Sequence, residues 1–405
     1  MARRLKKKVK YSLIIIIFIL LGYIFFSTYN YLSSKKEIPK EEPSNEEVIP
    51  KKEEEIIEEL PYESILNDNG IFSTFYEEAY NLLETMSLDE KISQIFLVRV
   101  PKENEISIIE EYQFGGYLLF GKDVNNITKE DLINKINSFQ TVSKIPSIIA
   151  IDEEGGTISR IRTNPNLVEE PFSSPMDLYK EGGLPLIEED LIRKNNLLTE
   201  LGINLNIAPV VDISSPDSFI YKRTLGEDAN TTSIYASKVI EVSKQSKVSY
   251  VLKHFPGYGD NIDTHTGIAI DNRTLDELKE KDFLPFISGI NSGAECILVN
   301  HNIMTNIEDN MPASLSKEVH NILRNDLSYT GIIITDDLYM DAIKKYQENP
   351  SIKALLAGND MIIITDYITG INEIKEAINN NTIDINILNK AVLRILAWKY
   401  YKGLL

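Results

Sequence analysis

Short apolar runs alternate with longer amphipathic stretches along the chain from about residue 75 onward. Eight of the runs are short enough for strands, contain no proline and are apolar at nearly every position, as expected for strands buried on both faces. They are 94–100, 116–120, 147–151, 204–207, 249–253, 296–300, 331–335 and 360–364. Eight such strands separated by helices predict an α/β fold, a single TIM-like (β/α)8 barrel.

Helix start signals fall in the gaps between these runs. A Ser or Thr three positions before an acidic residue has the spacing of a capping box. The pairs are Ser87 and Glu90, Thr128 and Asp131, and Thr274 and Glu277. The stretch 159–201 is too long for a bare loop, so we expect a helix and an elaborated loop there. An open doubly wound sheet is the alternative, but no Gly-x-Gly-x-x-Gly follows the first strand to support its usual dinucleotide binding.

The N-terminal residues have a different pattern. Six basic residues within 1–10 precede 11–32, which contain no charged residue. A helix of that length, rising about 1.5 Å per residue, would cross a hydrocarbon core of roughly 30 Å. Basic residues before the span predict a cytoplasmic N-terminus and a single-pass protein of the cell membrane, with the later residues extracellular. A cleaved signal peptide is the alternative, although no small-x-small site follows the apolar run.

The residues after the predicted span are rich in Glu, Lys and Pro, which predicts a solvated segment because few side chains can be buried there. The expected organisation is therefore a cytoplasmic basic tail (1–10), a transmembrane signal-anchor helix (11–32), an acidic flexible linker (33–74) and the barrel (75–405).

The composition predicts a sizeable hydrophobic core and an acidic surface. Hydrophobic residues make up 43% of the 405 residues, a normal share for a globular protein. The formal net charge is −19, which would repel a phosphate backbone, so we expect no nucleic acid partner. The one cysteine, Cys296, excludes an intramolecular disulfide, so the fold must depend on its core.

Polar and ionisable residues gather directly after four of the predicted strands. In a parallel barrel the active site is built at the carboxyl ends of the strands. The residues are Asp152, Glu153 and Glu154 after the third strand, Lys253 and His254 after the fifth, Asn300 and His301 after the sixth, and Asp336 and Asp337 after the seventh. An Asp after a strand often caps the next helix, so we interpret Asp337 as a cap and Asp336 as a side chain at the barrel mouth.

Three specific motifs lie in the second half of the chain. They are Lys-His-Phe-Pro-Gly-Tyr-Gly-Asp at 253–260, Asp-Thr-His at 263–265 and Ile-Thr-Asp-Asp-Leu-Tyr-Met at 334–340. Together with supporting motifs at 86–92, 115–120, 202–212 and 357–360, they resemble glycoside hydrolase family 3, specifically its β-N-acetylglucosaminidase branch. The resemblance covers 75–405 and implies that the barrel is the N-terminal-type catalytic domain of that family.

The resemblance also implies roles for single residues. It implies that Asp336 is the nucleophile of a covalent glycosyl-enzyme, that His265 is the acid/base and that Asp263 pairs with His265. The residues that it places around the sugar are Asp152, Arg160, Arg223, Lys253, His254 and Met340. His301 is either a support of the sugar site or a buried histidine with satisfied hydrogen bonds. No cofactor and no metal are expected.

This chemistry is also consistent with the residue types. A retaining mechanism needs one ionised carboxylate for attack and a second group that first donates and then accepts a proton. An imidazole can be that second group because its pKa lies near neutrality. In the second step neutral His265 would activate water; phosphate as the nucleophile is a minor alternative, which a carboxylate base would repel.

Some positions depart from the family pattern. Tyr258 stands where the family commonly has His, Glu153 where Gln is common and Thr157 where Arg is frequent. These departures bear on fine substrate preference. The chain ends at Leu405, before the second α/β domain from which many family β-glucosidases supply their acid/base, and this favours His265 for proton transfer.

The expected function is retaining cleavage of terminal β-linked N-acetylglucosamine, from peptidoglycan-derived fragments, by a monomer. Within the family, β-glucosidase or β-xylosidase specificity is the alternative. A metal-dependent barrel hydrolase is a second alternative, with His254, His265, His301 and Asp336 as ligands, although the His-x-His that it needs after an early strand is missing. A carbohydrate-binding protein with an inactive barrel is the third.

Overall fold

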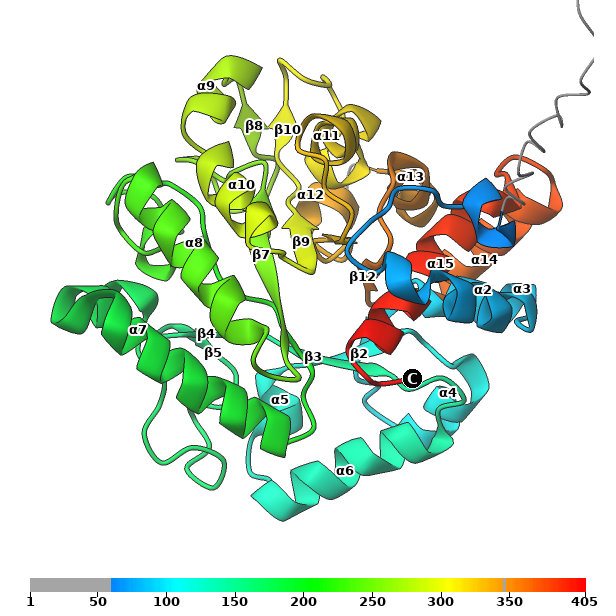
Figure 1. Cartoon of the computed structure of the whole chain (residues 1–405), viewed down its shortest axis with the longest axis horizontal. Helices are drawn as coiled ribbons and strands as arrows, with labels where there is room; N and C mark the ends of the chain where they lie inside the picture. The colour runs from blue at the N-terminus through cyan, green and yellow to red at the C-terminus, as the bar shows by residue number, and fades with distance from the viewer. Residues whose placement is uncertain (1–59, 345–346) are drawn as a thin grey trace, which may run out of the picture. The chain divides into compact units, whose positions relative to one another are not determined.

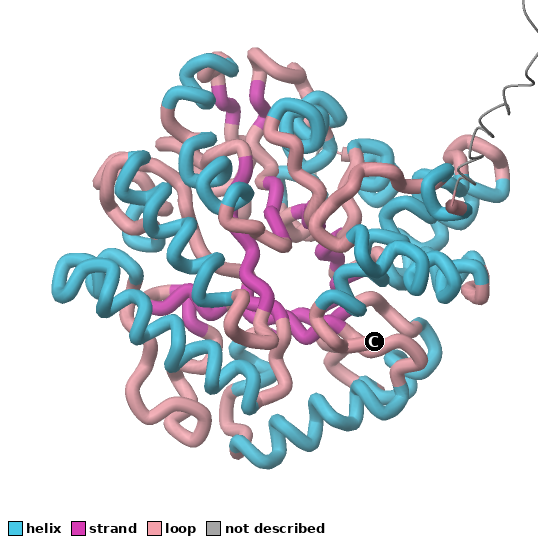
Figure 2. The backbone as a smooth tube through the Cα atoms, in the orientation of Figure 1, coloured by secondary structure: helices cyan, strands magenta, loops and turns pink. Residues whose placement is uncertain are grey.

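A closed parallel barrel forms the centre of the computed structural model, which describes residues 60–344 and 347–405. Its strands are β1 (Phe96–Arg99), β2 (Gly116–Leu119), β3 (Ile148–Ile151), β6 (Leu205–Asn206), β7 (Ser249–Phe255), β9 (Cys296–Val299), β11 (Ile332–Thr335) and β12 (Ile362–Ile364). They pair in the order β11-β9-β7-β6-β3-β2-β1-β12. A parallel bridge between Ile334 and Met361 joins the two ends of this order, so the sheet closes on itself. Figure 2 shows the strands as a ring surrounded by helices.

The predicted α/β class and eight-stranded barrel are confirmed. Every barrel strand overlaps its predicted segment, and β7 continues further, through His254 and Phe255. The strands are mainly apolar because the side chains inside the barrel cover one face and the helices cover the other, and their charged residues stand at or near the carboxyl ends. Two small sheets lie outside the barrel: β4 (Glu153–Gly155) with β5 (Ile158–Ser159), and β8 (Ile270–Asp271) with β10 (Ile303–Met304).

Helices cover the outside of the barrel (Figure 1). The α-helices are α2 (Tyr76–Glu84), α3 (Leu88–Gln94), α4 (Glu105–Tyr112), α5 (Gly121–Val124), α6 (Lys129–Val142), α7 (Pro175–Glu200), α8 (Ala229–Ser243), α9 (Leu275–Glu280), α10 (Phe283–Asn291), α11 (Lys317–Asn321), α12 (Asp341–Lys344), α13 (Pro350–Ala357), α14 (Tyr367–Asn379) and α15 (Ile385–Tyr401). The shorter turns are η1 (Pro61–Ser64), η2 (Ser73–Phe75), η3 (Tyr221–Arg223), η4 (Ala313–Leu315) and the π-helical η5 (Ile322–Asp326). The long α7 is the helix expected between 159 and 201.

All three predicted helix caps form. The side chains of Ser87, Thr128 and Thr274 accept the backbone N–H three residues further on, at the starts of α3, α6 and α9. Each cap satisfies one of the N–H groups that a helix leaves unpaired in its first turn. These helix starts are therefore encoded locally in the sequence.

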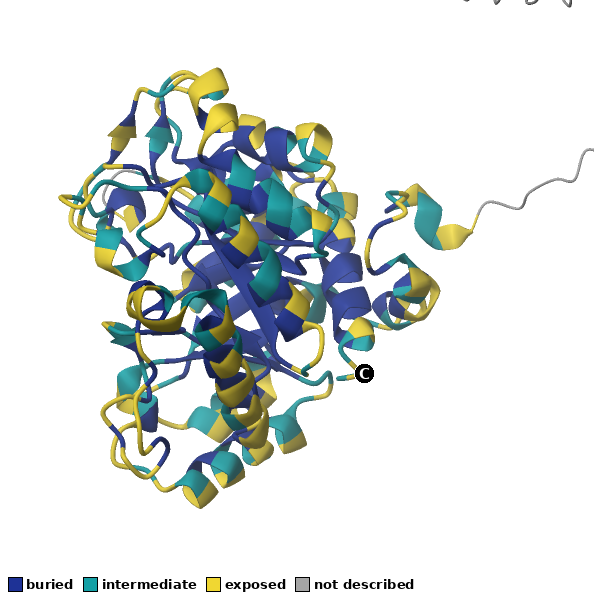
Figure 3. Ribbon diagram, turned by 60° about the vertical axis from the view of Figure 1, so that its left-hand side comes forward, coloured by how far each residue is buried: buried dark blue, intermediate teal, exposed yellow. Residues whose placement is uncertain are grey.

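Helix α15 packs on the outside of the barrel and covers part of the hydrophobic core. Its Trp398 is completely buried. Figure 3 shows buried residues in the centre and exposed residues on the outward helix faces. Residues 60–74, the described end of the predicted linker, also pack on this body, since Leu66 and Phe72 are buried and Asp68 lies 3.0 Å from Arg394. The domain boundaries themselves stay predictions.

The prediction of a single-pass membrane protein is corrected at this point. Its predicted span, 11–32, lies outside the described residues, as do the basic tail and residues 33–59. Within 60–344 and 347–405 no helix combines the length and the apolar composition that crossing a bilayer requires. The physical reason is that the longer of these helices carry charged side chains: even α7, whose 26 residues are interrupted by a kink at Gly183, has them along its length.

Lys399 should make the stability of the fold depend on pH. Its side chain on α15 is 0% exposed, and Nζ donates to Oε1 of Gln94 at 2.9 Å. Burial lowers the pKa of Lys399 to about 7. Because lysine in the unfolded chain has a pKa near 10.4, the unfolded state binds more protons between these two values, and stability rises with pH there. We expect Lys399→Met to flatten this rise by about 1 kcal/mol per pH unit, measured by urea denaturation at neutral and alkaline pH. Equal pH slopes for both proteins would contradict this.

Candidate active site

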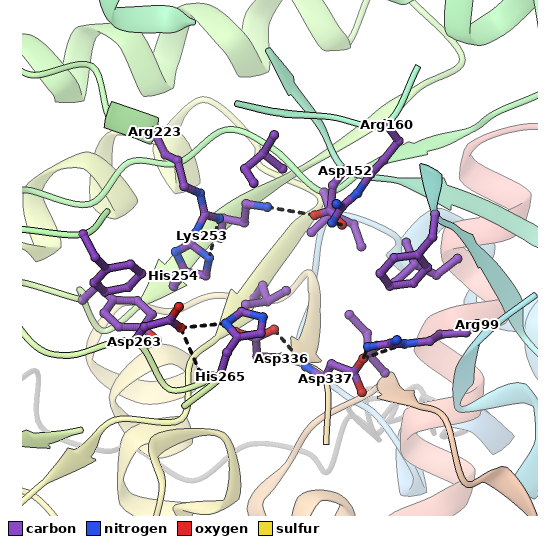
Figure 4. Close-up of a pocket in the computed structure, with 18 residues that line it drawn as sticks. Arg99, Asp152, Arg160, Arg223, Lys253, His254, Asp263, His265, Asp336 and Asp337 are labelled. Carbon is purple, nitrogen blue, oxygen red and sulfur yellow. Dashed lines mark hydrogen bonds and ion pairs between the residues drawn. The ribbon is translucent and has the colours of Figure 1, made fainter. Parts of the chain in front are cut away.

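A cavity of about 230 Å³ opens at the carboxyl ends of the barrel strands (Figure 4). Its charged lining residues are Arg99, Asp152, Arg160, Arg223, Lys253, His254, Asp263, His265, Asp336 and Asp337, and its aromatic lining residues are Phe120, Phe219 and Tyr258. The volume is below the roughly 300–1,000 Å³ of pockets for drug-sized ligands. The cavity therefore suits a small polar ligand the size of a single sugar.

One wall of the cavity is a cluster of ion pairs. Lys253 Nζ lies 3.0 Å from Asp152 Oδ1 and 2.6 Å from Glu154 Oε1. Arg160 contacts Asp152 at 2.9 Å, and Arg223 donates to both oxygens of Glu154 at 2.8 and 3.0 Å. Burial alone would raise the pKa of Asp152 and of Glu154, but the nearby cations outweigh it and hold both values below the ordinary range. Both carboxylates are ionised, and the cluster offers fixed donors and acceptors to hydroxyl groups.

The carboxylate of Asp212, which is outside the cavity lining, holds His254 in place. Oδ2 of Asp212 lies 2.7 Å from Nδ1 of His254 and accepts its backbone N–H at 3.1 Å, while Oδ1 accepts the N–H of Tyr258 at 2.6 Å. The chain between His254 and Tyr258 turns at Gly257, whose φ is 117°. A Cβ there would lie 2.7 Å from the Cβ of Asp282, so only glycine fits this turn.

Asp336 follows β11 and faces the cavity. Its N–H donates to the carbonyl of Val299 at 2.9 Å, which continues the barrel ladder, and its Oδ1 accepts the N–H of Asp337 at 2.8 Å. Burial raises the pKa of Asp336, but the imidazoles of His301 and His254 and the N–H of Asp337 together hold it below its ordinary value. A carboxylate that stays ionised at neutral pH is therefore fixed at the floor of the cavity.

Asp263 and His265 come from the loop after β7. Asp263 Oδ1 accepts the backbone N–H of His265 at 2.9 Å and lies 2.7 Å from its Nδ1 (Figure 4). This contact leaves Nε2 as the nitrogen that can exchange a proton with a ligand. His265 is also close enough to Asp336 for its charge to contribute to the lowered pKa of that carboxyl group.

Eight of the ten predicted site residues line the cavity, and two do not. His301 is buried beneath it, with Nδ1 at 2.7 Å from Ser314 Oγ and Nε2 at 3.1 Å from the carbonyl of Asp337, and burial lowers its pKa. Met340 is buried as well and is absent from the lining. Both contact the carbonyl of Asp337 instead, which also accepts the N–H of Met340 at 3.0 Å.

Sequence reasoning missed the ion pair of Arg99 with Asp337, at 2.5 Å. The guanidinium also lies over the Phe120 ring at 4.4 Å. Asp337 does not cap a helix, because α12 begins only at Asp341; its Oδ1 closes a turn by accepting the N–H of Tyr339 at 2.9 Å. Arg99 is the last residue of β1, so the rule that active-site residues stand at the carboxyl ends of barrel strands could have found it.

Metal ligation is the alternative use of such side chains. In the part of the chain that the structure describes, no three His, Cys, Asp or Glu residues are arranged to hold a metal ion. The ring nitrogens of His254 and His301 and Nδ1 of His265 are each within hydrogen-bond distance of protein atoms. The three histidines proposed as metal ligands therefore already contact protein atoms through these nitrogens.

A closed parallel barrel with ionised carboxylates and imidazoles in a sugar-sized cavity at its strand ends is the architecture of a barrel hydrolase. Residues 87–398 match the glycosyl hydrolase family 3 N terminal domain. This match covers most of the sequence, so the chain belongs to glycoside hydrolase family 3. The resemblance stated from the motifs and the prediction of a glycoside hydrolase are confirmed.

Similar proteins have related names. A β-hexosaminidase of Stenotrophomonas maltophilia (strain K279a) is 28% identical over 255 residues, which are 62% of this chain and 75% of that protein. A solved family 3 β-N-acetylglucosaminidase from Paenibacillus sp. str. FPU-7 is 25% identical, with a TM-score of 0.74 over 79% of this chain and 63% of that one. A fungal multi-domain β-N-acetylglucosaminidase of the family is 26% identical, with a TM-score of 0.71 over 78% and 39%. The chain spans less than two thirds of each of these two solved proteins.

Asp212 should be necessary for activity although it does not line the cavity. Asp212→Asn removes the charge that holds His254 and the N–H of Tyr258, and a hydrogen bond to a charged group contributes about 1.5–3 kcal/mol. We expect kcat/KM for glycoside hydrolysis to fall at least about tenfold with the fold retained, measured by steady-state kinetics and circular dichroism. Asp217→Asn, an exposed carboxylate on the same segment, is the matched control and should have the wild-type rate. A wild-type rate for Asp212→Asn would refute this role.

Proposed function

We propose that this glycoside hydrolase is a retaining β-N-acetylhexosaminidase that removes terminal β-linked N-acetylglucosamine. The observation that carries the proposal is the meeting, in one sugar-sized cavity, of an ionised Asp336 with the Asp263–His265 pair. The carboxylate of Asp336 suits attack on a sugar, and the Asp263–His265 pair suits proton transfer. The names of its relatives, β-hexosaminidase and β-N-acetylglucosaminidase, support the same activity.

Asp336 is the proposed nucleophile. Its lowered pKa keeps it ionised, so an oxygen lone pair can attack the anomeric carbon while the bond to the leaving oxygen breaks. His265, protonated at Nε2, donates its proton to that oxygen, and a covalent glycosyl-enzyme forms. Asp263 orients the imidazole, because its carboxylate lies 2.7 Å from Nδ1 and leaves Nε2 free to face the substrate.

The second step reverses these roles. Neutral His265 accepts a proton from water at Nε2, and the water oxygen attacks the anomeric carbon. The bond to Asp336 breaks, and the carboxylate is regenerated. Two displacements at one carbon retain its configuration.

The ion-pair cluster is the proposed binding wall for the sugar hydroxyls. Asp152 can accept from a hydroxyl, while Arg160 and Lys253 can donate to one. Arg223 and His254 complete the wall, with the guanidinium 3.4 Å from Nε2 of His254. Because each charge in this wall already has an oppositely charged partner, a neutral sugar can bind without leaving a buried charge unpaired.

Peptidoglycan-derived fragments are the proposed source of the sugar, since they carry β-linked N-acetylglucosamine. β-Glucosidase or β-xylosidase activity is the alternative within the family. Phenyl N-acetyl-β-glucosaminide and phenyl β-glucoside, assayed side by side, separate these specificities. Preference for the glucoside would refute the proposed substrate.

Replacement of the two proposed catalytic groups should have different effects. Asp336→Ala removes the nucleophile and should lower kcat/KM by at least about four orders of magnitude on every substrate. His265→Ala removes only proton transfer, so kcat/KM should fall about 10²–10⁴-fold for the phenyl glycoside and little for the dinitrophenyl glycoside, whose leaving group needs no proton. Equal losses on both substrates for His265→Ala would refute its role as the acid.

The configuration of the first-formed sugar tests the covalent step. A double displacement at Asp336 should release the β-anomer before mutarotation. Proton NMR spectra recorded immediately after enzyme addition distinguish the two anomers. Initial formation of the α-anomer would replace the retaining mechanism by an inverting one.

A further inference from the structure

The segment 262–267 carries Asp263 and His265, and its side chains alternate between solvent and protein. The side chains of Asp263 and His265 are 36% and 65% exposed. Thr264, which lies between them, is fully buried. Thr264 is therefore the point at which this exposed segment enters the body of the protein.

Thr264 makes the hydrogen bonds that hold the segment in place. Its N–H donates to the hydroxyl oxygen of Tyr258 at 3.0 Å, and its own hydroxyl forms a short hydrogen bond with the same oxygen. Its carbonyl accepts the N–H of Ala342 in α12 at 3.3 Å. Within residues 60–344 and 347–405, every hydrogen bond that joins 262–267 to other residues passes through Thr264.

Tyr258 is itself fixed to the barrel. It is buried, and its N–H donates to Oδ1 of Asp212 at 2.6 Å. Its ring packs edge-to-face against Phe219, with the ring centres 5.1 Å apart, and forms a small apolar cluster with Val210 and Ile220. The tyrosine hydroxyl therefore stands at a defined place relative to the cavity.

We propose that Tyr258 is a positioning residue for the acid/base, and that its hydroxyl holds the Asp263–His265 pair in place through Thr264. This inference rests on the proposed role of His265. Neither Asp263 nor His265 is buried deeply enough to fix its own position. The hydroxyl of Tyr258 fixes the pair because it is the hydrogen-bond partner of both the N–H and the hydroxyl of Thr264, the buried residue between Asp263 and His265.

Loss of this hydroxyl should impair proton donation selectively. Tyr258→Phe leaves the N–H and the hydroxyl of Thr264 without a partner in a buried place, which favours displacement of the segment. A displacement of about 1 Å can lower a rate about 100-fold when it misplaces a catalytic group. The nucleophile should keep its place, because Asp336 is held by β9 and by the backbone of Asp337.

The test compares Tyr258→Phe, Thr264→Val and the double variant in the full chain. For each, kcat/KM is measured on aryl N-acetyl-β-glucosaminides from dinitrophenyl to phenyl. We expect about a 10- to 100-fold loss for the phenyl glycoside and less than about a twofold loss for the dinitrophenyl glycoside. The double variant should lose no more than Tyr258→Phe alone, since that change already removes both hydrogen bonds between Thr264 and the tyrosine oxygen, whereas Thr264→Val removes only one of them.

Tyr117→Phe is the matched control, because this buried tyrosine hydroxyl on β2 has no hydrogen-bond partner among the described residues. It should have the wild-type profile across all leaving groups. Equal losses on all substrates, a raised KM alone or no loss in Tyr258→Phe and Thr264→Val would each overturn the proposal. Failure of the proposed function would look different: a wild-type chain without turnover, or a His265→Ala variant without leaving-group dependence.

Discussion

Closure of the parallel sheet is the constraint on which the candidate site depends. All eight strands run in the same direction, so their carboxyl ends meet at one rim of the barrel. Arg99 at the end of β1 and Asp337 after β11 are 238 residues apart in the sequence and 2.5 Å apart in space. An open sheet with the same strands would separate these two side chains.

The electrostatics of the cavity follow from that convergence. The protein as a whole is strongly acidic, yet Lys253, Arg160 and Arg223 gather on one wall, where each is paired with Asp152 or Glu154. Burial makes each unpaired charge costly, so these groups are stable only as a connected set. Asp336 is buried in the same region, and the neighbouring imidazoles together with the N–H of Asp337 hold its pKa below the ordinary value, so a carboxylate stays ionised where it faces a ligand.

The two proposed catalytic groups are held in different ways. Asp336 is part of the barrel ladder and moves with it, whereas the Asp263–His265 pair lies on an exposed segment joined to the protein through Thr264. A nucleophile must keep its place relative to the bound sugar, and a proton donor must reach the oxygen of leaving groups that differ in size. Asp212 holds both Tyr258 and His254 at the cavity wall. Tyr258 thereby ties the exposed acid/base segment to the same rigid wall that lines the cavity.

The sequence by itself determined the elements of the fold and the main candidates for chemistry. Apolar runs located all eight barrel strands, and the Ser and Thr caps located three helix starts, because both signals depend on neighbours within a few residues. The motifs around 253–265 and 334–340 indicated Asp336 and His265. Only the tertiary structure decided that Glu154, Asp212 and Arg99 complete the ion pairs, and that His301 and Met340 lie beneath the cavity. These contacts join residues far apart in the chain, and they exist only after the barrel has closed.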